Sequence, residues 1–441
     1  MAKNIPITTL DEDGYPQRPA SRRSLRNIVV HSSRRIVLLL LYAAMSLIGA
    51  LLQLKRRGQH YKPLTPRTFH PRRILVIRMD LIGDLVMSLT AIRVLKRAYP
   101  EAEIDLLALP SSASIVKADP DLSRIFTYDP NVWRRPKALA QPRRWLEAWQ
   151  LRRTLQARHY DLAISLYGNV AAMLTVLSGT KRSVGYTREG YPGFLTDGIA
   201  GKHWDTGDHK HEVDYCLALA EAAGATIMPT DRVPQLYVSE QTRQEVAHLL
   251  AQEGIDSETP FVACHVSSNN GQAKRWPLPY WSTLLERLTR ELGVSIVLTG
   301  APDDQPLIER VIERMQTPVV NMAGKTSLAQ LAGLMQQASL VISGDSGPMH
   351  IAEAIGTPLI AIHGPTDPVL SGPINPKAVI RSDIWCSPCY TTKGPADCRF
   401  YTTQCMKNII PERVFAMASN LLARDAHSAH HGYKKHEVEN S

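Results

Sequence analysis

One apolar segment of the sequence ends in small and polar residues, in the run 341–350 (Val-Ile-Ser-Gly-Asp-Ser-Gly-Pro-Met-His). This pattern predicts a strand followed at once by a short helix, which Gly356 and Pro358 end. The first N–H groups of a helix have no partner within it and lie at the positive end of its dipole, so they suit a phosphate or diphosphate. The run therefore predicts an anion site. The alternative is a structural corner of a sheet that binds no ligand.

Five residues of this run could contact such a ligand. Gly344 and Gly347 allow the backbone to approach it closely. Ser346 adds a hydroxyl donor, and His350 lies in the first turn of the expected helix. Asp345 is an anion beside an anion site, so we expect it to bind hydroxyl groups of a sugar or ribose instead.

Polar residues also follow other predicted strands in the second half of the chain. Ser267 and Ser268 lie at the end of an apolar run and offer two hydroxyls. Lys274 comes a few residues later, and a lysine beside a helix-start phosphate site neutralises the charge of a departing diphosphate. Asp303 and Thr326, which follow the next two strands, are predicted to contact the same ligand.

The first half of the chain has one candidate of its own. Gly83 and Asp84 follow the apolar strand 73–78 and precede a helix expected over 85–98. The glycine permits a tight turn, and the carboxylate points out from the carboxyl end of the strand. The alternative is that Asp84 only caps the helix, since aspartate is favoured at that position.

Alternating strands and helices must position these residues, and the sequence predicts an α/β fold. Strands alternating with helices of this kind imply parallel, doubly wound sheets, and two sets of them imply two Rossmann-like domains, at 72–234 and 235–424, with a linker at 229–234. Ligands of such sheets bind at the carboxyl ends of the strands, so motifs from both domains should meet across one cleft. Further strands are expected at residues 104–109, 161–166, 261–266, 294–298, 318–322 and 359–362.

The net positive charge of the chain comes from its N-terminal segment. The formal net charge is +10, but residues 1–73 carry 14 basic and 3 acidic residues, which leaves 37 basic and 38 acidic residues for the rest. A nucleic-acid-binding domain carries its charge on the folded body, so a nucleic-acid partner is not expected. The tail 425–441 is polar, and we expect it to be disordered.

Residues 36–54 lie within this basic segment (1–71) and contain no charge. As a helix they would be about 28 Å long, near the thickness of the hydrocarbon core of a bilayer. We expect an N-terminal hydrophobic helix that anchors the protein to a membrane, with the body in the cytoplasm. A buried or interfacial helix and an export signal are the alternatives.

At this point the motifs resemble glycosyltransferase family 9, the lipopolysaccharide heptosyltransferases and their relatives. The similarity extends over residues 72–422 and rests on segment 73–78 with Gly83-Asp84, block 265–277 ending in Lys-Arg-Trp-Pro, and segment 344–350 followed by Gly-Pro-Thr-Asp-Pro at 364–368. It implies a GT-B fold and a nucleotide-activated sugar, commonly ADP-heptose, held mainly by the C-terminal domain. The implied reaction inverts the anomeric centre and needs no metal or other cofactor.

The resemblance also assigns roles to residues. Asp84 matches the proposed catalytic base of the family, and Lys274 would stabilise the leaving diphosphate. Ser267, Ser268, Asp303, Thr326, Asp345, Ser346, Gly347 and His350 would bind the donor. Two departures affect the transfer of these roles: residues 269–273 read Asn-Asn-Gly-Gln-Ala where the core heptosyltransferases have an acidic loop, and Ser346 replaces the common threonine.

Four of the six cysteines gather near the end of the second domain, at Cys386, Cys389, Cys398 and Cys405. Thiolates that begin with a Cys-x2-Cys pair can bind a structural zinc ion. The alternative is free or locally packed thiols, since disulfides are not expected in a cytoplasmic body.

The favoured function is therefore an inverting glycosyltransferase at the cytoplasmic face of the bacterial inner membrane. Its partners would be a nucleotide-sugar donor, a lipopolysaccharide or envelope glycolipid acceptor, and the anionic membrane surface. A nucleotide-sugar epimerase acting on a soluble substrate and a non-catalytic sugar-nucleotide-binding protein are the alternatives.

Overall fold

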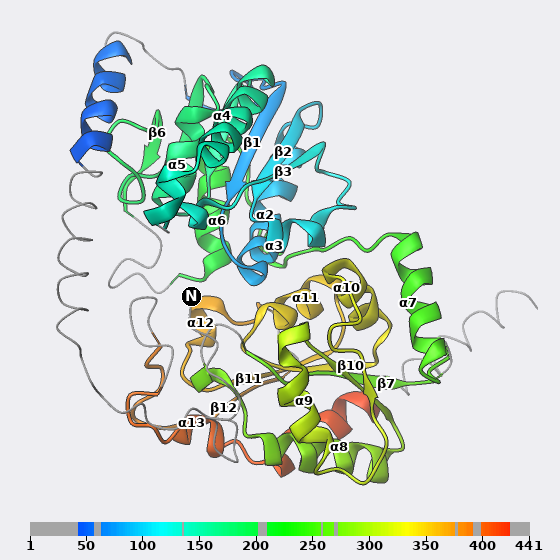
Figure 1. Cartoon of the computed structure of the whole chain (residues 1–441). Helices are drawn as coiled ribbons and strands as arrows, with labels where there is room; N and C mark the ends of the chain where they lie inside the picture. The colour runs from blue at the N-terminus through cyan, green and yellow to red at the C-terminus, as the bar shows by residue number, and fades with distance from the viewer. Residues whose placement is uncertain are drawn as a thin grey trace, which may run out of the picture. The chain divides into compact units, whose positions relative to one another are not determined.

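Two units make up the described part of the chain. The computed structural model describes residues 43–56, 63–134, 136–201, 210–256, 259–268, 272–374, 378–390 and 398–423. Contacts between residues divide it into one unit that ends at Pro234 and another that begins at Gln235. Each unit contains one six-stranded sheet with helices packed around it (Figure 1). All the strand pairs are parallel, so the predicted α/β class with two doubly wound sheets is confirmed.

The sheet of the N-terminal unit has the order β3-β2-β1-β4-β5-β6. Its strands are β1 (Arg73–Arg78), β2 (Glu103–Ala108), β3 (Arg124–Thr127), β4 (Leu162–Ser165), β5 (Arg182–Tyr186) and β6 (Asp197–Ile199). The chain runs outward from β1 to β3 and then returns to β4 on the other side of β1. The carboxyl ends of β1 and β4 therefore form a topological switch point, where open α/β sheets bind ligands.

Helices cover both faces of this sheet. They are α2 (Ile82–Ala98), α3 (Pro110–Ala113), α4 (Pro142–Ala157), α5 (Gly168–Leu177) and α6 (Glu212–Ala222), with short 3-10 helices η2 (Ser114–Val116), η3 (Pro130–Arg134), η4 (Pro136–Ala140) and η5 (Pro229–Arg232). Leu151 and Leu155 of α4 pack against the core around Leu75 and Ile77 of β1. Burial of these apolar side chains holds the helix on the sheet.

The first helix after β1 begins earlier than the sequence pattern predicts. It starts at Ile82, and Leu81 is its N-cap residue. Asp84 therefore occupies the third helical position, where its carboxylate accepts a hydrogen bond from the backbone N–H of Leu81. The alternative that Asp84 serves as the N-cap is wrong, because residues 82–84 already belong to the helix and Leu81 is the N-cap.

The sheet of the C-terminal unit has the order β12-β11-β10-β7-β8-β9. Its strands are β7 (Phe261–His265), β8 (Ser295–Thr299), β9 (Val320–Asn321), β10 (Leu340–Gly344), β11 (Leu359–His363) and β12 (Ala378–Arg381). The chain runs outward from β7 to β9 and then returns to β10 on the other side of β7, its parallel neighbour in the sheet. This pair forms the second switch point.

The helices of this unit begin and end near the turn signals in the sequence. They are α7 (Glu240–Gln252), α8 (Leu278–Leu292), α9 (Gln305–Ile312), α10 (Leu328–Gln337), α11 (Gly347–Ile355), α12 (Pro368–Ser371) and α13 (Gln404–Lys407), with 3-10 helices η6 (Gln272–Lys274) and η7 (Pro302–Asp304) and a last helix over residues 411–423. Gly356 ends α11 at a φ of +82°, a left-handed conformation that glycine adopts without strain. The predicted end of this helix is thus confirmed.

The apolar segment 36–54 lies only partly within the described residues. Residues 43–56 form a helix, and Arg56 donates a hydrogen bond to the carbonyl oxygen of Gly193, 2.9 Å away. A Cβ atom at Gly49 would lie 1.7 Å from the carbonyl oxygen of Pro192, so only glycine allows this close packing. Among the helices of the described ranges, none has both the length and the apolar character needed to cross a membrane.

Candidate active site

Lys274 and Asp345 form a buried ion pair at the switch point of the C-terminal unit. Lys274 ends η6 and its Nζ lies 2.7 Å from Oδ2 of Asp345, the residue that follows β10. Only 8% of Lys274 and 6% of Asp345 are exposed. Burial by itself would raise the pKa of Asp345, but the positive charge of Lys274 and the proximity of His363 outweigh burial and hold this pKa at about 2. Asp345 is therefore ionised at neutral pH.

Two residues that the sequence analysis missed complete this cluster. His363 ends β11, the neighbour of β10, and is fully buried beside Asp345 and Thr366. Burial lowers its pKa, so the imidazole is neutral at pH 7. The ring of Tyr390 lies 4.4 Å from the Lys274 Nζ, in a cation–π contact. The rule that ligands bind at strand ends would have found His363, because β11 was itself predicted.

The hydroxyls after β7 lie on the other side of the same switch point. Ser267 Oγ lies 3.2 Å from Nε2 of His265, whose Nδ1 lies 3.1 Å from Oγ1 of Thr299. Burial lowers the pKa of His265 to about 4, so this ring is neutral and fixed by hydrogen bonds at both nitrogens. Ser268 Oγ is buried and makes no hydrogen bond to any described residue. A buried hydroxyl without a partner is costly, which fits a polar ligand at this point.

The start of α11 follows β10 as predicted. Ser346 is the N-cap residue, yet its hydroxyl lies 3.1 Å from Oγ of Ser343 and makes no capping bond to the helix. Pro348 is the second helical residue and has no N–H, so the backbone N–H groups of Ser346 and Gly347 are the ones available to an anion. His350 is buried one turn into the helix.

The other two predicted donor contacts follow the outer strands. Asp303 lies in η7 after β8, and Thr326 lies just before α10, after β9. Both belong to the carboxyl edge of the sheet, one and two strands beyond β7. The Lys274–Asp345 pair belongs to the centre of that edge.

Arg78 organises a second cluster, at the switch point of the N-terminal unit. It ends β1, only 2% of it is exposed, and it contacts three carboxylates: Glu212 Oε1 at 2.9 Å, Asp80 Oδ2 at 3.2 Å and Asp84 Oδ1 at 3.6 Å. Glu212 is the first residue of α6 and is also buried. Asp84 was predicted from the sequence, whereas Asp80 and Glu212 were not. Glu212 lies 134 residues from Arg78 along the chain, so only the fold brings the two together.

Arg78 carries one positive charge and cannot neutralise three carboxylates, and the remaining negative charge affects the pKa of Asp84. Partial burial and the negative charges of Asp80 and Glu212 raise the pKa of Asp84 to about 7, against the opposing effects of Arg78 and the Leu81 N–H. Its side chain keeps 32% of its surface exposed, so another molecule can reach the carboxylate. A carboxylate with a pKa near neutrality is suited to accept a proton from a reacting hydroxyl.

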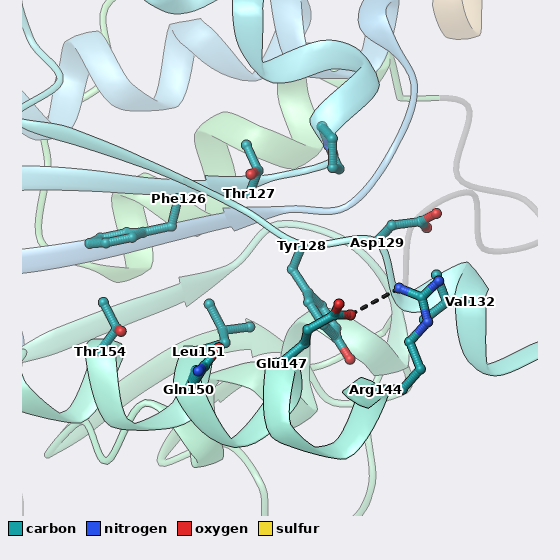
Figure 2. A pocket seen from close by; sticks show the side chains of 11 residues that line it. Phe126, Thr127, Tyr128, Asp129, Val132, Arg144, Glu147, Gln150, Leu151 and Thr154 are labelled. Carbon is teal, nitrogen blue, oxygen red and sulfur yellow. Dashed lines mark hydrogen bonds and ion pairs between the residues drawn. The ribbon is translucent and has the colours of Figure 1, made fainter. Parts of the chain in front are cut away.

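A separate cavity of about 440 Å³ lies between the end of β3 and α4. Figure 2 shows Tyr128 and Asp129 on one side of it, with Arg144 and Glu147 of α4 on the other. None of the predicted site residues lines it. The cavity therefore does not coincide with either charged cluster.

The four clustered cysteines are free thiols in the structure. Cys405 is buried, which together with the three neighbouring cysteines raises its pKa to about 11. Burial opposes ionisation of Cys398, but backbone N–H groups of residues 400, 402 and 403 lower its pKa. Within the described ranges, no three cysteine, histidine or acidic side chains converge to hold a metal ion. The structural zinc site stays a prediction.

Comparison with known proteins gives the family. The model of glycosyltransferase family 9 (heptosyltransferase) matches residues 148–399, more than half of the chain. The chain belongs to glycosyltransferase family 9. The family predicted from the sequence motifs is thus confirmed, and membership favours the predicted glycosyltransferase over the epimerase and the binding protein.

Three comparisons place this family 9 glycosyltransferase more closely. It is 31% identical to lipooligosaccharide heptosyltransferase 2 of Haemophilus ducreyi, over 80% of this chain and 99% of the relative. It is 28% identical to lipopolysaccharide heptosyltransferase 2 of Escherichia coli, with the same coverage. Among solved structures, the E. coli ADP-heptose lipopolysaccharide heptosyltransferase II matches with a TM-score of 0.63 and 26% identity, over 80% of this chain and 99% of that one.

Proposed function

We propose that this glycosyltransferase moves a heptose from ADP-heptose to a hydroxyl group of a lipopolysaccharide core, with inversion at the anomeric carbon. The names of the similar heptosyltransferases support the donor and the acceptor. The observation that carries the chemistry is Asp84, a reachable carboxylate with a pKa of about 7 at a switch point. A sugar transfer needs such a base on the acceptor side and charge compensation on the donor side.

The proposed step is a single displacement. The acceptor oxygen attacks the anomeric carbon, its proton passes to the Asp84 carboxylate, and the bond from that carbon to the diphosphate oxygen breaks. Arg78 lies 3.6 Å from Asp84 and limits the rise of its pKa. Without this guanidinium, Asp84 would be protonated at neutral pH and would not act as a base.

The leaving ADP gains negative charge as the bond breaks. Lys274, the hydroxyls of Ser267 and Ser268, and the backbone N–H groups at Ser346 and Gly347 are the groups proposed to stabilise it. Asp345 would bind hydroxyl groups of the sugar, and Asp303, Thr326 and His350 would complete the donor contacts. These groups supply the charge compensation without a catalytic metal ion, so we propose a metal-independent reaction.

We also propose that the enzyme acts at a membrane surface. The basic segment 1–71 would hold the enzyme at the cytoplasmic face of the inner membrane, where anionic lipids and a phosphorylated acceptor attract it. Residues 36–54 would contribute apolar contact with the bilayer.

The test is release of nucleoside diphosphate from a panel of nucleotide sugars, with and without detergent-solubilised core glycolipid. We expect release from ADP-heptose that depends on the acceptor, persists with a chelator, and falls about 10²–10⁴-fold in Asp84→Asn. Glu101→Gln, which changes an exposed carboxylate of the same unit, is the control and should match the wild type. Release from a different donor would overturn the assignment of heptose, and turnover in the absence of any acceptor would overturn the transfer itself.

A further inference from the structure

Helix α4 exposes an apolar and aromatic face that its own fold does not need. Leu151 and Leu155 attach the helix to the core. On the other side, Trp145, Leu146 and Trp149 are each at least half exposed. Large apolar side chains that gather on one exposed surface usually mark an interaction site.

Contacts of Trp145 with neighbouring residues fix its position on this exposed surface. The ring of Trp145 packs edge-on against Trp133 with 4.8 Å between centroids, and its Nε1 donates a hydrogen bond to the carbonyl oxygen of Leu139, 3.0 Å away. Leu139, in the preceding η4, is also more than half exposed. The exposed apolar residues of η4 and α4 therefore form one continuous patch, Leu139, Trp145, Leu146 and Trp149, which we call the α4 face.

Positive charge accompanies the α4 face. Helix α4 carries four arginines and one acidic residue, Glu147, which pairs with Arg143 and Arg144 at 3.0 and 2.9 Å. Arg152 and Arg153 are exposed and follow Trp145 by seven and eight residues, so they share its side of the helix. The Arg153 guanidinium lies 4.8 Å from the Trp149 ring. This is local charge, because the chain after residue 73 is almost neutral.

We propose that the α4 face binds the surface of an anionic phospholipid bilayer. Tryptophan favours the boundary between headgroups and acyl chains, and arginine on the same side of a helix pairs with phosphate groups there. Figure 2 shows Arg144 and Glu147 as an ion pair that lines the cavity. Glu147 follows Trp145 by two residues, and side chains two residues apart on a helix do not face the same side. The α4 face contains no residue of either charged cluster or of the basic segment 1–71, and its test does not depend on turnover.

The experiment measures quenching of tryptophan fluorescence in the full-length protein by vesicles of brominated phosphatidylglycerol. Because quenching needs contact with the lipid, it reports the α4 face even where residues 36–54 also bind. We expect Trp145→Phe/Trp149→Phe to lose most of the quenching, while an aromatic ring stays at both positions. Trp385→Phe, which replaces an 83% exposed tryptophan of the other unit, is the control and should keep it.

A second variant keeps all the tryptophans. Arg152→Gln/Arg153→Gln should weaken partition into anionic vesicles, by about fivefold for each arginine, and about 0.5 M salt should reduce the difference. Equal quenching in the wild type and the double phenylalanine variant would overturn the proposal. Failure of the wild type to bind the vesicles would overturn it as well.

Discussion

At the scale of single residues, the two charged clusters shift the pKa of a carboxylate in opposite directions. Arg78 holds three carboxylates and leaves the pKa of Asp84 near 7. Lys274 faces one carboxylate and holds the pKa of Asp345 at about 2. An excess of negative charge thus prepares Asp84 to take a proton, whereas the one-to-one pair keeps Asp345 ionised as a fixed hydrogen-bond acceptor.

The pKa of Asp84 predicts how activity and stability depend on pH. Since the base must be ionised, kcat/KM should rise with pH through about 7 in the wild type, and Glu212→Gln should move this midpoint to lower pH by removing a negative charge. Rates measured from about pH 5 to about pH 9 check both. A purely structural role of Glu212 would change the rate and leave the midpoint in place.

The free energy of unfolding should fall as pH rises, whereas the activity should rise. The folded pKa of Asp84 lies above its ordinary value of 3.8, so its ionisation opposes folding, with no penalty below pH 3.8 and the full penalty above about pH 7. Asp84→Asn should therefore gain stability over the wild type as pH rises through that range. Denaturant unfolding at several pH values measures this, and a gap independent of pH would contradict it.

The Lys274–Asp345 pair predicts a second set of variants. Lys274→Met leaves a buried carboxylate without its partner, so the free energy of unfolding should fall by about 3 kcal/mol. Lys274→Met/Asp345→Asn removes both charges and should recover most of that loss, but neither variant should transfer sugar. Denaturant unfolding and the release assay measure the two effects. Recovery of activity together with stability would show that the pair is only structural.

At the scale of elements, the long apolar strands and their turn residues could be predicted from the sequence. Strand β1 was found at its bounds, and β7 and β11 to within one residue, because buried parallel strands form continuous apolar runs. Strands β3, β5, β6 and β12 were missed. They have three to five residues and include arginine, aspartate or glycine, so their neighbours in the sheet decide their conformation.

The residues of the two charged clusters also divide into those that local sequence patterns predict and those that only the tertiary fold brings together. Asp84, Lys274 and Asp345 are readable because each follows a recognisable strand or turn, whereas Glu212 joins Arg78 only through the packing of α6 on the sheet. The docking of helix 43–56 is another tertiary feature of this kind. An apolar run predicts a helix, but only the structure shows that Gly49 meets Gly193.

That contact predicts a matched pair of variants. Gly49→Leu should push helix 43–56 off the loop at residues 192–194 and speed trypsin cleavage at Lys55 and Arg56 by roughly tenfold, because proteolysis follows the population of the open form. Ala50→Leu adds the same side chain at an exposed position of the helix and should cleave like the wild type. Equal rates for the two variants would contradict the docking.

At the scale of the whole molecule, the two units repeat one architecture but differ in their switch points. The strand order reverses beside β1 in one sheet and beside β7 in the other. The first switch point holds a carboxylate near its pKa, and the second holds a lysine, hydroxyls and a helix start. This division fits the proposed transfer, in which the N-terminal unit would activate the acceptor and the C-terminal unit would bind the anionic leaving group.

This division predicts where a nucleotide protects the chain. In hydrogen–deuterium exchange, ADP should slow exchange in the segments after β7, β10 and β11, and leave α2 and the residues around Asp84 unchanged. Lys274→Met should lose this protection because a diphosphate then meets Asp345 without its counter-charge. Protection centred on the N-terminal unit would reverse the assignment of donor and acceptor sites.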